Sequence, residues 1–169
     1  MPRNKAFEEK SLFSLEEILC AKPVLAGLGS PLRGDDRFGL LVCEELNKRG
    51  IPCIMCEYGL ENCLDEILAE KKRTLVVFDA LLCESCSSGD LVLADIESVV
   101  DKELFVTTHN LPLNLVIKLL KEAGIERIFV IGAAPRALEI SEELSEEVKN
   151  ALMGLVELLE NTLKKCAEE

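Results

Sequence analysis

The sequence predicts an α/β protein built as a single doubly wound, three-layer domain, with a mostly parallel five-stranded sheet and helices on both faces. The first observation is length: 169 residues, 49% of them hydrophobic, suffice for one core and are too few for two. Second, apolar runs that suit buried strands alternate with helical segments. Third, no repeat, low-complexity tract or linker divides the chain. We therefore take 1–169 as one domain, in which 1–22 form an N-terminal extension with a short helix.

Five segments are expected to form the sheet. The clearest runs from Thr74 to Asp79, because its apolar residues suit burial on both faces of a parallel sheet. The expected strands are 24–29, 52–58, 74–79, 90–96 and 127–132. Residues 104–107 should add a short extended piece. We expect the first and third strands to be neighbours, which places a topological switch point between them.

Capping residues mark the expected helix starts. Ser14 and Glu17 have the spacing of a capping box, in which each side chain bonds to a free amide of the other residue. Asn110 can cap a helix with Pro112 in its first turn, and Ser145 can cap a long final helix. Apolar residues recur along one face of that last helix, namely Val148, Leu152, Leu155, Val156, Leu159 and Leu163. The expected helices are 14–21, 36–48, 62–71, 110–123 and the segment after Ser145.

The charge balance excludes several classes of function. With a net charge of −12 and a pI of about 4.7, the surface should repel phosphate backbones and anionic lipid headgroups. No apolar run approaches the length of a bilayer span, and residues 1–10 are too polar for a signal peptide. We therefore expect a cytoplasmic protein that binds neither nucleic acid nor membranes. Its single histidine excludes a zinc protease that needs two.

The eight cysteines, in a chain without a signal peptide, favour reduced thiols over a disulfide framework. Cys53 and Cys56 form one Cys-x-x-Cys pair and Cys83 and Cys86 another, so a shared zinc site is one possibility. We favour buried or incidental thiols, because positions three apart on the expected strand 52–58 face opposite sides. Cys83 and Cys86 could instead form a loop disulfide or a redox pair. The others are interpreted as core or surface thiols: Cys20, Cys43, Cys63 and Cys166.

The loop after the first expected strand is rich in glycine but unsuited to phosphate. It reads Gly27-Leu-Gly-Ser-Pro-Leu-Arg-Gly-Asp-Asp36. Leu32 replaces the third glycine of a dinucleotide fingerprint, and two aspartates stand where a Walker loop has Lys and Ser or Thr. Because Asp35 and Asp36 bring negative charge to the helix start, a cation should bind there better than a phosphate. The simpler interpretation is that both only cap the helix and balance its dipole.

Asp36, Asp79 and His109 are the candidate catalytic and metal-binding residues. Asp79 ends the strongest strand, and sites in open α/β sheets lie at the carboxyl ends of strands. His109 lies in a loop that should reach the same edge. Two carboxylates and an imidazole suit a borderline divalent ion such as nickel or zinc, with positions left open for substrate. The simpler interpretations are a turn-forming Asp79 and a hydrogen-bonded bystander at His109.

Five segments match, in order, the motifs of one enzyme family. They are Gly27-Leu-Gly-Ser-Pro-Leu-Arg-Gly-Asp-Asp36-Arg-Phe-Gly39, Val76-Val-Phe-Asp79-Ala80, Thr107-Thr-His109-Asn-Leu-Pro-Leu113, Ile131-Gly-Ala-Ala-Pro135 and Leu144-Ser-Glu-Glu-Val148. Through these segments the chain, from about 24 to 163, resembles the nickel–iron hydrogenase maturation endopeptidases. In that family the second acid of the first motif, the strand-end aspartate and the histidine form the metal site. The matching residues here are Asp36, Asp79 and His109.

The resemblance implies an endopeptidase of the aspartic or metal-dependent type. Its substrate and partner would be the large-subunit precursor of a nickel–iron hydrogenase, whose C-terminal extension it removes after nickel insertion. Nickel would arrive bound to the precursor, so the free protein can lack metal, and zinc or cadmium could substitute. The metal could polarise the scissile carbonyl or activate water, with Asp36 or Asp79 as base.

The chain departs from the family pattern in two places, of which the second bears on substrate choice. Ser30 stands where the family has asparagine, a change between two turn-forming residues. The family's Asp-Gly-Gly-Thr after the second strand is replaced by Glu57-Tyr-Gly-Leu-Glu61, which lacks the aspartate and the threonine. The alternative function is a non-catalytic, Rossmann-like ligand-binding or regulatory module, in which the acidic loop only caps a helix.

Overall fold

The computed structural model describes residues 8–10, 13–101, 113–136 and 140–168. They form a six-stranded sheet with the order β1-β5-β6-β4-β2-β3. The strands are β1 (Glu8–Lys10), β2 (Val24–Gly29), β3 (Ile54–Glu57), β4 (Thr74–Ala80), β5 (Leu91–Asp95) and β6 (Arg127–Ala133). All neighbouring strands are parallel except β5 and β6, which are antiparallel.

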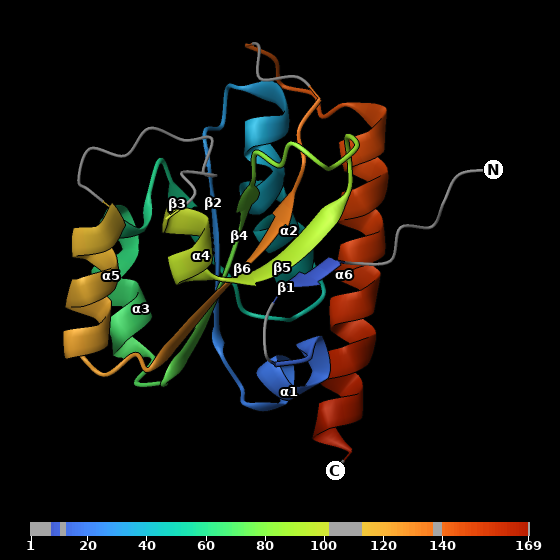
Figure 1. Ribbon diagram of the computed structural model, residues 1–169. Coiled ribbons are helices and arrows are strands. Elements are labelled where there is room, and N and C mark those ends of the chain that lie inside the picture. Colours follow the sequence, from blue (N-terminus) through green and yellow to red (C-terminus); the bar gives the residue numbers. More distant parts are fainter. Residues whose placement is uncertain (1–7, 11–12, 102–112, 137–139, 169) are drawn as a thin grey trace.

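Helices cover both faces of this sheet (Figure 1). The α-helices are α1 (Leu15–Cys20), α2 (Phe38–Lys48), α3 (Leu64–Ala69), α4 (Ile96–Asp101), α5 (Leu113–Glu122) and α6 (Glu146–Ala167). Two 3-10 turns, η1 (Gly34–Arg37) and η2 (Leu60–Cys63), lead into α2 and α3. None of the helices in the described ranges is long and apolar enough to cross a bilayer.

Two separate apolar clusters confirm the three layers. One cluster packs α1, α2 and α6 against the sheet and contains Phe38, Phe78 and Leu155. The other lies under α3, α4 and α5 and contains Leu75 and Val130. Alternate residues of β4 therefore enter opposite clusters, as the apolar pattern of a strand buried on both faces requires. The predicted α/β doubly wound fold class is confirmed.

The observed elements differ from the expected ones in a few places. The sheet has a sixth strand, β1, whose sequence Glu-Glu-Lys has no apolar pattern by which it could be predicted. Helix α4 follows β5 directly where only a strand was expected. The predicted helices 36–48 and 62–71 each begin with a 3-10 turn. The predicted extended piece 104–107 and helix start at Asn110 lie outside the described residues.

The prediction of reduced thiols is wrong for this structure, because all eight cysteines are paired. The disulfides are Cys20–Cys166, Cys43–Cys53, Cys56–Cys63 and Cys83–Cys86. Cys53 and Cys56 enter opposite apolar clusters, as their spacing on a strand predicted, so they do not share a zinc site. The partners could not be read from composition, since Cys20 and Cys166 are 146 positions apart and meet only when α1 packs on α6.

Candidate functional site

The carboxyl ends of β2 and β4 meet at the topological switch point of the sheet. Strand β2 pairs with β3 on one side and β4 on the other, which confirms the expected neighbourhood of the first and third strands. Asp79 lies near the end of β4, and Asp36 lies in η1, which follows β2. Both aspartates are completely buried, at 0% exposure. The switch point thus holds two of the three predicted site residues.

Two glycines allow the start of α2 to pack closely on β2 and β4, and this packing places both aspartates at the same edge of the sheet. A Cβ atom on Gly39, in the first turn of α2, would lie 2.1 Å from the carbonyl oxygen of Phe78. A Cβ atom on Gly27 of β2 would lie 2.0 Å from the carbonyl oxygen of Gly39. No other residue type fits at either position, because real Cβ atoms do not approach backbone so closely. The start of α2 therefore rests directly on the strand ends, with Asp36 close to the residue that follows Phe78.

The glycine-rich loop itself bends back onto η1. Gly29 has a φ of +153°, and a Cβ atom there would lie 2.0 Å from the carbonyl oxygen of Asp36. That carbonyl accepts a hydrogen bond of 3.2 Å from the backbone N–H of Ser30. Close packing of the chain on itself therefore explains the glycines of the motif. It also places the carboxylates of Asp35 and Asp36 inside the fold.

At the switch point, the carboxyl group of Asp79 has a shifted pKa. Burial raises the pKa of its carboxyl well above the usual value of 3.8, and the negative charge of Asp36 raises it further. The backbone N–H of Ala80, which donates to Asp79 Oδ1 at 2.8 Å, acts in the opposite direction and is outweighed. Asp79 Oδ2 is buried without a hydrogen-bond partner among the described residues. An uncompensated buried oxygen beside a second carboxylate is a site where a proton or a cation is strongly favoured.

His109, the third predicted site residue, lies outside the described residues. The proposed three-residue site therefore stays a prediction. Within the described ranges, no three His, Cys, Asp or Glu side chains converge in a way that could hold a metal ion. The structure thus provides a pair of carboxylates, Asp36 and Asp79, whose interaction is evident in the raised pKa of Asp79.

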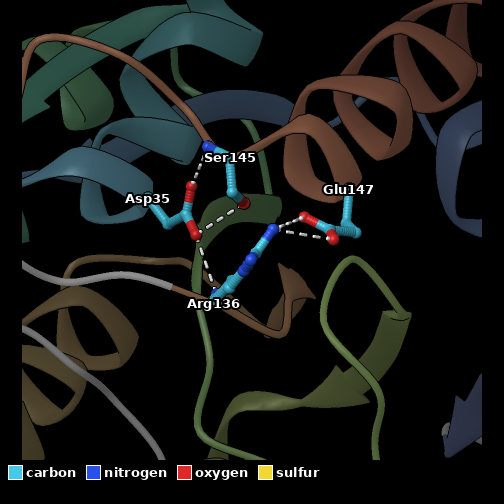
Figure 2. A network of polar contacts seen from close by, with 4 residues as sticks. All are labelled: Asp35, Arg136, Ser145 and Glu147. Atoms are coloured by element: carbon cyan, nitrogen blue, oxygen red, sulfur yellow. Dashed lines mark hydrogen bonds and ion pairs between the residues drawn. The ribbon is translucent and has the colours of Figure 1, made fainter.

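Asp35 has a different role from its neighbour, and the sequence interpretation missed it. Its Oδ1 accepts a hydrogen bond from the backbone N–H of Ser145 at 2.8 Å. Its Oδ2 accepts from the Ser145 hydroxyl at 2.8 Å and from the backbone N–H of Arg136 at 2.7 Å. Figure 2 shows these contacts, together with the ion pair between Arg136 and Glu147. The expectation that Asp35 merely caps its own helix is wrong, because its carboxylate binds residues 101 and 110 positions away.

Ser145 occupies the N-cap position of α6, as predicted, but its side chain does not cap that helix. Its hydroxyl donates to Asp35 instead. No local pattern reveals this pairing, because both residues have ordinary helix-start sequences. The one sequence signal is that Asp35 and Ser145 belong to the first and last of the five motifs described above.

Comparisons with known proteins agree on one family. The model of the family HycI, described as hydrogenase maturation protease, matches residues 61–162. A protein of Methanocaldococcus jannaschii, assigned as a hydrogenase maturation protease, is 29% identical over 164 residues, which cover 89% of this chain and 90% of that protein.

Solved structures extend the likeness to the fold. The crystal structure of the [NiFe] hydrogenase maturation protease HycI from Thermococcus kodakarensis is 32% identical, with a TM-score of 0.76, and the match covers 89% of this chain and 98% of that one. The solution structure of the endopeptidase HycI from Escherichia coli is 27% identical, with a TM-score of 0.68, and the match covers 82% and 89% of the two chains.

Proposed function

Because this chain belongs to the hydrogenase maturation protease family, we propose that it removes the C-terminal extension of a nickel–iron hydrogenase large-subunit precursor after nickel insertion. The observation that carries this proposal is the buried pair Asp36 and Asp79 at the switch point of the sheet. The relatives are proteases, so they favour it over a non-catalytic ligand-binding module.

The chemistry of the pair suits recognition of a metal that the substrate carries. Two carboxylates in a buried setting repel each other, and a divalent cation relieves both the repulsion and the unsatisfied Oδ2 of Asp79. Together with the imidazole of His109, they would form a mixed oxygen and nitrogen set suited to nickel. Three protein ligands leave coordination positions for the precursor's own groups.

Asp79 is the stronger candidate for moving a proton. A carboxylate with a raised pKa is a better base near neutral pH than an ordinary surface aspartate. In the proposed reaction, water attacks the scissile carbonyl and the C–N bond breaks, while Asp36 or Asp79 takes a proton from the water and passes it to the leaving amine. Nickel held by the precursor would polarise that carbonyl or activate the water. Because both carboxylates are at 0% exposure, docking of the precursor has to open access to them.

The test compares cleavage of nickel-loaded and nickel-free large-subunit precursors, with mass measurement of the released peptide. Wild-type protein should release one C-terminal peptide from the nickel-loaded form only. Asp36→Asn, Asp79→Asn and His109→Ala should each lower the cleavage rate by roughly 10²–10⁴-fold, the usual contribution of an acid–base group.

Asp65→Asn is the matched control, because it makes the same change of side chain at an exposed position in the first turn of α3. It should cleave at the wild-type rate. Normal cleavage by folded Asp79→Asn protein would refute the proposed site, and equal cleavage of both precursor forms would refute the dependence on nickel.

A further inference from the structure

We propose that Asp35 is a positioning residue for the protease reaction: its carboxylate fixes η1, and thereby the catalytic Asp36, to the start of α6 and the loop after β6. This inference rests on the proposed function, since it concerns the placement of Asp36 opposite Asp79. The side-chain contacts that support it are made by Asp35 with Arg136 and Ser145, none of which is a proposed catalytic residue.

Strong hydrogen bonds hold the carboxylate of Asp35 in place. Asp35 is at 0% exposure, and both of its carboxylate oxygens accept hydrogen bonds of 2.7–2.8 Å from three donors. Hydrogen bonds to a charged acceptor are shorter and stronger than neutral ones, and burial keeps water from competing for them. Two of the donors are backbone N–H groups, one at Ser145, the N-cap of α6, and one at Arg136, three positions after the end of β6 (Figure 2).

Asp35 is linked to Asp36 by one peptide bond within a short turn. The two residues are adjacent within a 3-10 turn of four residues, so neither can shift without the other. The preceding segment is fixed to the same region of the fold, because the N–H of Gly34 donates to the carbonyl of Ser141 at 2.9 Å and the N–H of Ser141 donates to the carbonyl of Leu32 at 3.0 Å. The N–H of Asp36 donates to the carbonyl of Arg33 at 2.9 Å. The turn is thus anchored to a segment about 100 residues away.

The two adjacent acids, Asp35 and Asp36, have different roles. The Asp35 carboxylate accepts hydrogen bonds from Ser145 and Arg136. Asp36 lies in the same turn, and its negative charge raises the pKa of Asp79. A site built for a transition state tolerates little displacement, and an error of about 1 Å can cost roughly 10²-fold in rate. Loss of the Asp35 contacts should therefore lower the rate of the chemical step more than it weakens precursor binding.

The main test is Asp35→Asn, measured by kcat and KM for cleavage of the nickel-loaded precursor. An asparagine side chain has an NH₂ group in place of one carboxylate oxygen. In either orientation, this NH₂ donor lies opposite another donor, the backbone N–H of Ser145 or that of Arg136. We expect kcat to fall roughly 10–100-fold while KM stays within about twofold. The matched control is Glu147→Gln, which removes only the exposed ion pair to Arg136 and should leave kcat unchanged.

A second pair of variants keeps the proposal testable if Asp35→Asn does not fold. Ser145→Ala removes one of the three donors and retains the backbone bond. It should lower kcat roughly 3–10-fold, in line with the net value of a single typical hydrogen bond. Ser145→Thr restores a hydroxyl and should restore kcat. A purely structural role would lower stability in Ser145→Ala without this loss and recovery of kcat at unchanged KM.

Two results would overturn the inference: wild-type kcat in folded Asp35→Asn protein, or equal kcat in Ser145→Ala and wild type. They are distinguishable from failure of the proposed function. If Asp79→Asn abolishes cleavage and Asp35→Asn does not, only the positioning role fails. If Asp79→Asn cleaves normally, the proposed site itself is wrong.

Discussion

The two ends of the sheet differ in the kinds of residues that they bury. At the carboxyl end, the strands terminate among buried acids, namely Asp35, Asp36 and Asp79. At the amino end of β2, helix α1 packs on α6 through Leu15, Ile18 and Leu19, and the Cys20–Cys166 disulfide joins the two helices (Figure 1). The first end holds groups that are costly to bury, and the second holds apolar contacts and a covalent link. The comparison teaches that one end of the fold gains stability from apolar contacts and a crosslink that take no part in the site.

The amino end should therefore determine stability without affecting cleavage. Cys20→Ser opens a loop of 146 residues and should lower the free energy of unfolding by about 2–4 kcal/mol, since a crosslink over a long loop restricts the unfolded chain. The measurement is urea unfolding under oxidising conditions. In the same preparation, kcat for precursor cleavage should stay within about twofold of wild type, because the disulfide is at the end of the sheet opposite the site.

Cys166→Ser is the control for this prediction, because it breaks the same bond from the other side. The two single variants and the double variant should unfold at the same urea concentration. Additive losses in the double variant would show that the serines act through local packing and not through the crosslink.

How much of each end of the sheet could be predicted from the sequence depends on how far apart in the chain the contacting residues are. Apolar runs identified the strands, and strand alternation identified the switch point, because these signals are local. The roles of Asp35 and Asp36 could not be separated, since two identical adjacent side chains differ only in which distant groups they meet. The pairing of Cys20 with Cys166 and the addition of β1 beside β5 likewise depend on contacts far apart in sequence. His109, chosen from its loop position and its motif, lies outside the described residues and stays a prediction.

The packing at the carboxyl end can be broken by a single methyl group. Gly39→Ala should lower the free energy of unfolding by about 2–3 kcal/mol, because its Cβ would lie 2.1 Å from the carbonyl oxygen of Phe78 and overpacked sites respond by this amount. It should also reduce cleavage, since α2 and η1 must move away from the strand ends. Thermal unfolding and the cleavage assay measure the two effects.

Gly154→Ala is the matched control, because Gly154 also lies within an α-helix, α6, and a Cβ there meets nothing within 4 Å. It gains the same helix propensity without the clash, so it should raise stability by about 0.5–1 kcal/mol and leave cleavage unchanged. A loss of stability in Gly154→Ala would mean that glycine is required in these helices for a reason other than close packing.

The smallest expected effect is the change in stability with pH that is due to Asp79. It tests the contrast between the two ends of the sheet most directly, because it requires that a site residue destabilises the fold. The pKa of Asp79 is raised in the folded state, so between pH 3.8 and that raised value the native protein binds more protons than the unfolded chain. The contribution of Asp79 to stability must therefore fall as pH rises through this window and level off above it. Asp79→Asn should lack this slope and, at neutral pH, should gain about 1 kcal/mol, or roughly 2–4 °C in Tm. Urea unfolding of both proteins across a pH series measures the difference, with Asp65→Asn expected to follow wild type. A variant that is less stable than wild type at neutral pH would show that Asp79 supports the fold, and the contrast between the two ends of the sheet would no longer hold.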